Sequence, residues 1–541
     1  MIEPPGDADQ AKGNWMARLA RFFQTLIFAA AAAAASITAA AAADLRIGLP
    51  SPSTSMDPHF QALVPNSSVL ENIFEALIKI DPDSKFGPSL AESWKAVSDT
   101  AWEFKIRKGV KFHDGTELTA EDVVYSINRP ATITNSPAPY TIYTRTIAES
   151  KAIDSHTVQF VTRIPHPTLI NDLASVAILS KKASEGVRSE DMATGKGVVG
   201  TGPYKFVSYV REERVELVRN DSYWGGKPDW DKVQIRFITS APSRLAALLA
   251  GDVDAIESVP TQDIARVKGD AKFNYAQKVS HRVIYFYIDS GRDQTPMVTA
   301  KDGSPLAKNP LKDVRVRRAI SSAINREAIR DRIMEGLAYP TGNYVTETLF
   351  GNNPDVKMPA FDADGAKKLL AEAGYPDGFG MTIVGPNNRF VNDARIVEAV
   401  GQMLSRIGIA AKVDTMPMAP YTTRGPKGEF SFGLIGWGAA TGEVSSTLRA
   451  IIACANRDKG FGQFNWSNYC NPQVDGLLEK AITTIDDGQR LRLLQDAVKI
   501  ATDEVAIVPM HFQATSWATK KGIKVIARTD ERTLASTFAP E

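Results

Sequence analysis

The sequence has 541 residues, which is too long for one compact core, so we expect at least two lobes. Its 63 lysines and arginines nearly balance its 62 aspartates and glutamates, for a formal net charge of +1. A nucleic-acid-binding protein needs a basic surface, so this balance argues against that class of protein.

Residues 1–43 have the pattern of a secretory signal peptide. A basic segment comes first, and an apolar run that begins at residues 26–28 continues as a stretch of mostly alanine. The three alanines at 41–43 suit signal peptidase, so we predict cleavage between Ala43 and Asp44. The run is too weakly apolar for a membrane anchor, and no later apolar run reaches 18 residues. We therefore expect a mature protein that is free in the periplasm, without stable insertion into a membrane.

The first predicted strand–helix–strand unit lies within residues 233–256. Residues 233–237 alternate between apolar and polar side chains like a half-exposed strand. Ser243 is the predicted N-cap of a helix through Ala250, which Gly251 ends before a second strand at 253–256. This order predicts one α/β unit.

A second unit is predicted within residues 381–434. Residues 381–384 predict a strand, and apolar side chains at helical spacing from Ile396 to Ile407 predict a helix that Gly408 ends. Strands at 409–413 and 430–434 follow. This succession predicts a parallel or mixed sheet with covered faces, and two such units fit an α/β protein with two lobes.

Further elements surround the second unit. Asn325 is the predicted N-cap of one helix, and Asn471 with Pro472 forms the N-cap and first turn of another. Residues 506–510 predict a strand. The continuation of that strand through residue 519 could lead the chain back to the first lobe.

The sequence contains two cysteines, Cys454 and Cys470, with 15 residues between them. An oxidising compartment allows them to pair, so we predict a disulfide rather than two buried free thiols. Neither cysteine has a second ligand at Cys-x-x-Cys spacing, and the six histidines are scattered singly. We therefore predict no metal site and no cofactor.

The sequence offers no recognisable arrangement of catalytic residues. It has no G-x-S-x-G, no H-E-x-x-H and no phosphate-binding G-x-x-x-x-G-K motif. We therefore expect a binding protein and not an enzyme.

Several strings, in their order along the chain, resemble the family 5 extracellular solute-binding proteins, the peptide, dipeptide and nickel group of ABC importers. These strings are SLAESW at 89–94, RKGVKFHDGT at 107–116, TAEDVV at 119–124, GTGPY at 200–204 and YWGGKP at 223–228. The resemblance runs from Leu45 to the C-terminus. Most of these strings suit turns and packing, so they identify a scaffold and not a solute.

The resemblance implies an α/β, bilobal fold like that of periplasmic binding proteins, with an extra subdomain inserted in the first lobe and a two-strand hinge. The signal peptide at 1–43 would be followed by a discontinuous lobe I at 44–75, 200–280 and 512–541. The inserted subdomain would occupy 76–199 and lobe II would occupy 281–511. Ligand would be enclosed between the lobes.

The candidate ligand contacts follow two predicted strands of lobe II, since crevices in open α/β sheets lie beyond the carboxyl ends of strands. The first loop carries Asn388 and Arg389, and the five donors of Arg389 suit bidentate capture of a carboxylate. The loop is similar to the place where dipeptide-binding relatives hold the carboxylate of their ligand. The second loop carries Trp437 between Gly436 and Gly438, a rigid surface that a ligand can approach closely.

The second loop departs from the pattern of peptide-binding relatives. They carry an aspartate that holds the ligand's ammonium, and the position that corresponds to it here is Ala440. Glu443 is the nearest carboxylate. Either Glu443 takes that role, or the ligand lacks a conventional free amine, because a desolvated ammonium without a partner costs a few kcal/mol.

The resemblance implies a substrate-binding component of an ABC importer that captures a short peptide or peptide-like solute. It would close on a hinge and deliver the solute to membrane permeases that work with cytoplasmic ATPases, and we expect a monomer. Two alternatives share the fold: a binder of an opine, a sugar or a metal chelate, and a ligand-presenting partner of a chemoreceptor.

Overall fold

The structure is a computed structural model, and it describes Met1 and residues 44–439 and 441–541. The predicted signal peptide, with its cleavage site after Ala43, lies outside the described residues, and so does Ala440. Within the described residues, no helix combines the length and the apolar character needed to cross a membrane.

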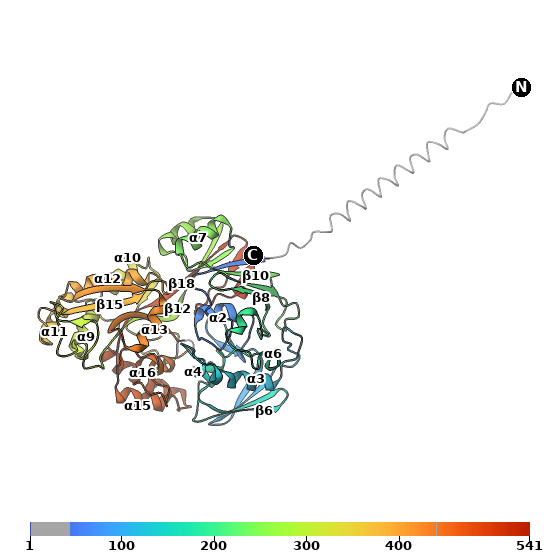
Figure 1. The fold of residues 1–541 in the computed structure, drawn as a ribbon, viewed down its shortest axis with the longest axis horizontal. Helices are drawn as coiled ribbons and strands as arrows, with labels where there is room; N and C mark the ends of the chain where they lie inside the picture. Colours follow the sequence, from blue (N-terminus) through green and yellow to red (C-terminus); the bar gives the residue numbers. More distant parts are fainter. Residues whose placement is uncertain (2–43, 440) are drawn as a thin grey trace. The chain divides into compact units, whose positions relative to one another are not determined.

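A large mixed sheet runs through both halves of residues 45–541 (Figure 1). Within the described residues it has twelve strands. In their order across the sheet, the strands of the main path are β13 (Val298–Thr299), β15 (Gly380–Pro386), β17 (Phe432–Gly438), β12 (Phe273–Ile288), β18 (Ile507–Lys520), β11 (Ala255–Glu257), β1 (Asp44–Leu49), β10 (Lys232–Phe237), β9 (Arg214–Arg219) and β8 (Tyr204–Val210). Two further strands branch from this path, β14 (Ala338–Pro340) beside β18 and β16 (Ala410–Met416) beside β15.

Strands β12 and β18 connect the two halves of this sheet. They pair antiparallel from Phe273 opposite Lys520 to Tyr287 opposite Ile507, with shifts of register near Val279 and Ile284. The second half of β12 also pairs with β17, whereas the C-terminal part of β18 pairs with β11. Figure 1 shows β12 and β18 between the region with α9, α11 and α12 and the region with α2 and β8. These two strands fit the predicted hinge, and the α/β fold with two lobes is as predicted.

The second predicted α/β unit is present in the structure. β15 and β16 pair in parallel from Gly380 opposite Ala410, and α12 (Asp393–Ser405) connects them. The apolar stripe of α12 packs against the sheet, and its residues Ile396 and Val400 are completely buried. Burial of each such side chain stabilises the fold by about 1.5–3 kcal/mol. Gly408, at φ +100°, follows the helix as predicted.

The first predicted unit is also present, with one correction at the start of its helix. Helix α7 (Ala241–Ala250) begins three residues earlier than predicted, because Ser240 and not Ser243 is the N-cap. The Ser240 side chain accepts a hydrogen bond from the Ser243 backbone N–H, and Pro242 occupies the first turn, where its missing N–H costs nothing. Gly251 ends the helix at φ +86° as predicted.

The inserted segment has its own antiparallel sheet and its own buried core. Its strands follow the order β4 (Ala91–Ser98), β5 (Ala101–Ile106), β7 (Thr157–Thr162) and β6 (Ile147–Asp154). Two smaller strand pairs join β2 (Ile78–Ile80) to β3 (Phe86–Pro88) and β19 (Ile523–Val525) to β20 (Phe538–Pro540). A separate core in this segment supports a distinct subdomain, and the predicted boundaries of the lobes and subdomain stay a prediction.

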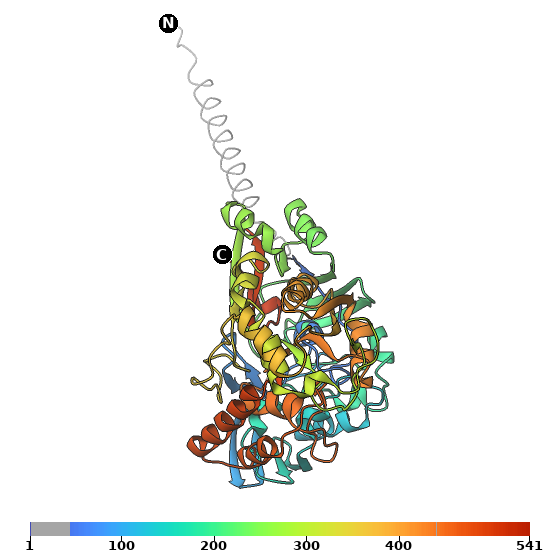
Figure 2. The same ribbon diagram turned by 90° about the vertical axis from the view of Figure 1, so that its left-hand side faces the viewer.

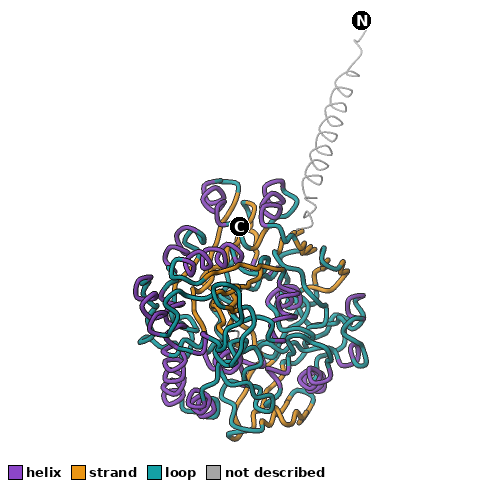
Figure 3. The backbone as a smooth tube through the Cα atoms, turned by 60° about the vertical axis from the view of Figure 1, so that its left-hand side comes forward, coloured by secondary structure: helices purple, strands orange, loops and turns teal. Residues whose placement is uncertain are grey.

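Helices flank the strands most clearly on the left-hand side of Figure 3. Those in the N-terminal half are α2 (Val64–Leu70), α3 (Ala120–Asn128), α4 (Thr141–Thr144), α5 (Leu169–Leu173), α6 (Lys181–Ser184), α7 and α8 (Ile264–Gly269). Those in the C-terminal half are α9 (Val314–Ser322), α10 (Arg326–Arg332), α11 (Ala363–Glu372), α12, α13 (Met418–Arg424), α14 (Val444–Thr447), α15 (Pro472–Ala481) and α16 (Asp487–Asp503). The predicted caps Asn325 and Asn471 start α10 and α15.

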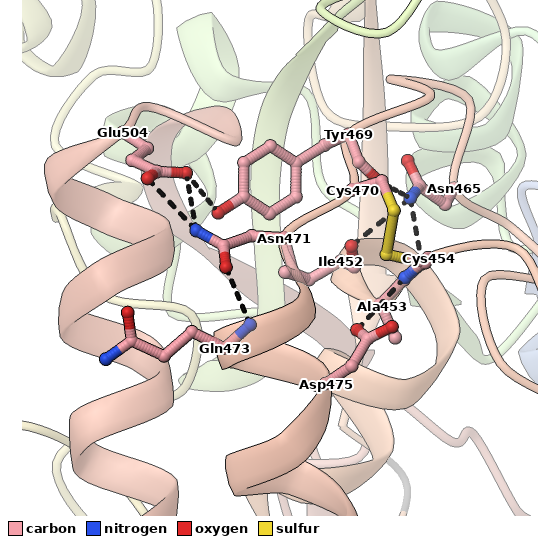
Figure 4. The surroundings of a disulfide bond; sticks show 10 residues. All are labelled: Ile452, Ala453, Cys454, Asn465, Tyr469, Cys470, Asn471, Gln473, Asp475 and Glu504. Atoms are coloured by element: carbon pink, nitrogen blue, oxygen red, sulfur yellow. Dashed lines mark hydrogen bonds between the residues drawn. A yellow bond between two sulfur atoms is a disulfide. The ribbon is translucent and has the colours of Figure 1, made fainter.

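Cys454 and Cys470 are joined in a disulfide (Figure 4). The buried amide of Asn465 donates hydrogen bonds to three carbonyls of the same loop, including that of Tyr469 at 2.8 Å. The backbone N–H of Cys454 donates to Asp475 on α15 at 3.1 Å. The disulfide therefore fastens this loop to the start of α15.

Candidate functional site

Two cavities lie between the predicted lobes and share part of their walls. The larger has a volume of about 420 Å³, and its walls include residues 49–51, 239–242 and 257–261 from lobe I and 387–395 from lobe II. The smaller has a volume of about 190 Å³, and its walls include residues 529–532 from lobe I and 436–439 from lobe II. Val64, Arg389 and Glu531 line both cavities. The pair of cavities is therefore the candidate site, and Arg389 lies where they meet.

The loop that carries Arg389 is fixed by the first residue of helix α12. The backbone N–H groups of Arg389 and Phe390 donate to one carboxylate oxygen of Asp393 at 2.9 and 3.0 Å. The other oxygen of Asp393 accepts from the N–H of Ala394 at 2.9 Å. Asp393 therefore joins the loop after β15 to the start of α12, which holds the backbone of Arg389 at the cavity wall.

The guanidinium of Arg389 is a cation without a counter-charge in contact with it. Within residues 44–439 and 441–541, it forms no ion pair and donates no side-chain hydrogen bond, and it lies 5.1 Å from the ring centre of Phe390. The pKa of Arg389 is lowered to about 10, mainly by burial and then by the charge of Arg282, whereas Glu531 and Glu257 act in the opposite direction. Arg389 stays charged at neutral pH, so an anion that enters the cavities meets an unpaired guanidinium.

Trp437, Gly436 and Gly438 lie at the end of strand β17 and line the smaller cavity. The Trp437 ring packs 5.3 Å from the ring of Phe464, and within the described residues its buried indole N–H has no hydrogen-bond partner. A side chain at position 436 would come within 2.8 Å of the Phe390 ring. Glycine is needed at position 436 because the side chain of Phe390 packs against the backbone there. This reason differs from the predicted one, which was the close approach of a ligand.

The remaining two predicted residues occupy different environments. Asn388 lines the larger cavity, and its side-chain oxygen accepts a hydrogen bond from the N–H of Met418 at 2.8 Å. Glu443 lines neither cavity. Its buried carboxylate forms an ion pair with Arg490 and accepts a hydrogen bond from Ser445. The structure thus brings Asn388 and Arg389 together with residues 436–438 around the cavities, and it places Glu443 elsewhere.

Four charged residues at the walls of the smaller cavity did not follow from the sequence. Arg282 on β12 forms a buried ion pair with Glu531 at 2.7 Å. Asp530 and Arg532 line the smaller cavity beside this pair. Two signals could have found them: an arginine within an otherwise apolar part of β12, and the dense run of charges at 528–532 after the last long strand.

Hydrogen bonds also join the inserted subdomain to lobe II. Arg145 donates to the carbonyls of Arg457 and Asp458 at 2.8 and 3.1 Å. Asn171 donates to the carbonyl of Thr441 at 2.7 Å. Figures 1 and 2 both show the subdomain around α4 beside α15 and α16 of lobe II. These contacts join the predicted inserted subdomain to the predicted lobe II in this structure.

A further contact crosses the larger cavity next to Arg389. Asn392 has a left-handed backbone at φ +54°, and its side-chain amide donates to Thr261 of lobe I at 3.0 Å and to the carbonyl of Ile333 at 2.7 Å. A left-handed conformation is costly outside glycine and persists where the surroundings enforce it. The turn at Asn392 therefore serves both the start of α12 and the contact between the lobes.

The site offers enclosure and charge recognition. Within the described residues, no group of three or more His, Cys, Asp or Glu side chains is arranged to hold a metal ion. The walls provide an unpaired guanidinium and balanced ion pairs. Such an arrangement can bind an anionic or dipolar solute in the cavities between the two predicted lobes.

Comparisons with known proteins agree with this fold. The family model described as bacterial extracellular solute-binding proteins, family 5 middle, matches residues 85–459, which is more than half of the chain. A dipeptide-binding protein of Escherichia coli K12 is 29% identical over 451 residues, covering 78% of this chain and 80% of the relative. Heme-binding protein A of Haemophilus influenzae is 26% identical over 467 residues, 81% of each chain.

A solved structure shows the same fold. The periplasmic binding protein DppA of Helicobacter pylori, in complex with the peptide STSA, aligns with a TM-score of 0.80 at 24% identity. The alignment covers 92% of this chain and 98% of that protein.

Proposed function

The chain belongs to the family 5 bacterial extracellular solute-binding proteins, and from this membership we propose that it is the periplasmic substrate-binding component of an ABC importer. It captures a short peptide or peptide-like solute between its lobes and delivers it to membrane permeases that cytoplasmic ATPases drive. It works as a monomer without catalytic activity. Its N-terminal segment 1–43 directs export and is removed before Asp44.

The unpaired guanidinium of Arg389 is the observation that supports a peptide as the ligand. A half-buried cation without a counter-charge is unfavourable, and a carboxylate offers two oxygens that match the fork of donors. In this proposal the C-terminal carboxylate of the ligand binds Arg389 at the junction of the cavities. A side chain of the ligand lies in the smaller cavity beside Trp437, with Gly436, Gly438 and Asn388 in its surroundings.

Capture requires the lobes to open and close about β12 and β18. Two lobes joined by few segments can rotate as rigid bodies, and a ligand favours the closed state when it contacts both lobes. Lobe I comprises residues 44–75, 200–280 and 512–541 in this proposal, and lobe II comprises 281–511. The hydrogen bonds of Arg145 and Asn171 then belong to the closed state alone.

Calorimetry with short peptides tests the role of Arg389. We expect Arg389→Ala to weaken binding about 100-fold, since truncating one partner of a buried charge pair costs about 2–5 kcal/mol. Arg389→Lys should recover only part of this loss, because an ammonium cannot make the bidentate contact. Arg406→Ala, an exposed arginine of the same lobe, is the matched control.

The ligand offers a second control. A peptide with a C-terminal amide should bind the wild-type protein as weakly as the free acid binds Arg389→Ala. Equal affinity for the acid and the amide would reject Arg389 as the carboxylate site.

A further inference from the structure

Glu257 is a carboxylate at the wall of the larger cavity, on the lobe opposite Arg389. It ends strand β11, and the same cavity is lined by both residues. One oxygen of Glu257 accepts a hydrogen bond from the hydroxyl of Thr533 at 2.6 Å. Within the described residues no lysine, arginine or histidine forms an ion pair with it. Glu257 and Arg389 therefore line one cavity without forming an ion pair with each other.

The other carboxylates at the cavity walls are engaged. Glu531 is paired with Arg282 at 2.7 Å, and Asp530 is paired with Arg528 at 2.6 Å. Asp393 accepts hydrogen bonds from three backbone N–H groups. Among the described acidic residues that line the two cavities, Glu257 alone has neither a cation nor a set of backbone donors. It is the available acceptor for a positive group.

We propose that Glu257 binds the ammonium group of the solute while Arg389 binds its carboxylate. This inference rests on the proposed function, and it names the ligand as a zwitterion with a free amine. Because position 440 is alanine, another carboxylate has to bind the ammonium group of the ligand. Glu443 is paired with Arg490, whereas Glu257 forms no ion pair within the described residues. The two contacts come from opposite lobes, so only the closed protein makes both, and the ligand thereby favours closure.

The volume of the larger cavity agrees with a small zwitterion. Ligand pockets in proteins usually measure about 300–1,000 Å³, and this one measures about 420 Å³. An extended peptide advances about 3.3–3.6 Å per residue, so a peptide of two to four residues can place its two charged ends at two separate points of the cavity walls.

The protonation of Glu257 makes such binding depend on pH. The pKa of Glu257 is raised to about 7, mainly by burial and also by the charge of Glu531. The hydrogen bond from Thr533 and the more distant charges of Arg244 and Arg389 act in the opposite direction. An ammonium ligand favours the ionised carboxylate. Its affinity is therefore highest above the pKa of Glu257 and is lost as the pH falls through it.

Calorimetry with alanine peptides of two to four residues and their N-acetylated forms tests this role. For the free peptides and the wild-type protein, we expect affinity to fall about tenfold from pH 7.5 to pH 5.5. Glu257→Gln should weaken free-peptide binding at least about tenfold at pH 7.5 and abolish this pH dependence. Glu92→Gln, at an exposed position of β4, is the matched control.

Each outcome decides one of the two proposals. If the N-acetylated peptides bind the wild-type protein as tightly as the free ones, or if Glu257→Gln binds like the wild type, Glu257 is not the ammonium site, and the solute-binding function stands. If no alanine peptide binds in either form, the peptide ligand itself is rejected and Glu257 with it. The comparison of free and acetylated peptides uses only wild-type protein, so it decides the question even if the variant does not fold.

Discussion

Removal of the Arg145 side chain should weaken ligand binding from a distance, because Arg145 contacts lobe II and neither cavity. The substitution Arg145→Ala deletes the two hydrogen bonds to the carbonyls of Arg457 and Asp458. Gly460 makes room for this contact, since it has φ +66° and a side chain there would come within 1.6 Å of the guanidinium. Gly460→Ala should therefore expel Arg145 and produce the same effect by a different route.

The magnitude follows from the contacts that are lost. Each intramolecular hydrogen bond contributes about 0.5–1.5 kcal/mol net, so this partly exposed pair contributes about 1–2 kcal/mol. If these bonds exist only in the closed state, the dissociation constant rises by about five- to thirtyfold, since 1.4 kcal/mol is a factor of ten. The effect should appear in the dissociation rate, because the open protein that first meets the ligand is unchanged.

Stopped-flow binding of a peptide that the wild-type protein captures measures both rates. Arg188→Ala is the matched control, because Arg188 is an exposed arginine that pairs with Asp191 within the predicted inserted subdomain. The double variant with Gly460→Ala should be little weaker than either single variant, since both remove one contact. A dissociation rate of Arg145→Ala within twofold of that of the control would refute the reasoning.

Two further predictions concern residues outside the two cavities. Glu443→Gln should leave peptide affinity unchanged and lower the free energy of unfolding by about 2 kcal/mol, because it leaves Arg490 without its buried counter-charge. Calorimetry measures the affinity and thermal denaturation measures the stability. Weaker binding at unchanged stability would contradict a purely structural role of Glu443. Replacing Cys454 and Cys470 together with serine should lower the unfolding free energy by about 3 kcal/mol, since the disulfide closes a loop of 16 residues. Denaturant titration of the whole protein measures this loss as a lower unfolding midpoint. An unchanged midpoint would contradict the prediction and mean that the loop is already restricted in the unfolded chain.

Local elements were predictable where the chain itself carries the signal. The unit of β15, α12 and β16 followed from an apolar stripe at helical spacing and from Gly408 at its end. The start of α7 was misplaced because Pro242 allows an earlier start, so that the cap moves to Ser240. This error is small, because a cap at Ser240 or at Ser243 predicts a helix that ends at the same residue.

The site was predictable only in part, because its other residues meet through the tertiary fold. Arg389 lies in the loop after β15 and Trp437 lies at the carboxyl end of β17, and the rule for α/β sheets finds them. Glu443 lies close to them in sequence, yet its partner Arg490 comes 47 residues later, and sequence spacing does not reveal that pairing. Glu257 belongs to a short apolar strand and reaches the cavity only because the two lobes come together around it.

Mass spectrometry of the solute that leaves the protein on denaturation tests the central claim most directly. The protein should be produced in a bacterial periplasm, purified gently and denatured, in parallel with Arg389→Ala as a control. We predict a short peptide or peptide-like molecule with a free carboxylate and a free amine, bound to the wild-type protein and depleted from the variant. A sugar, or any bound solute that lacks a carboxylate and is retained equally by Arg389→Ala, would contradict the account.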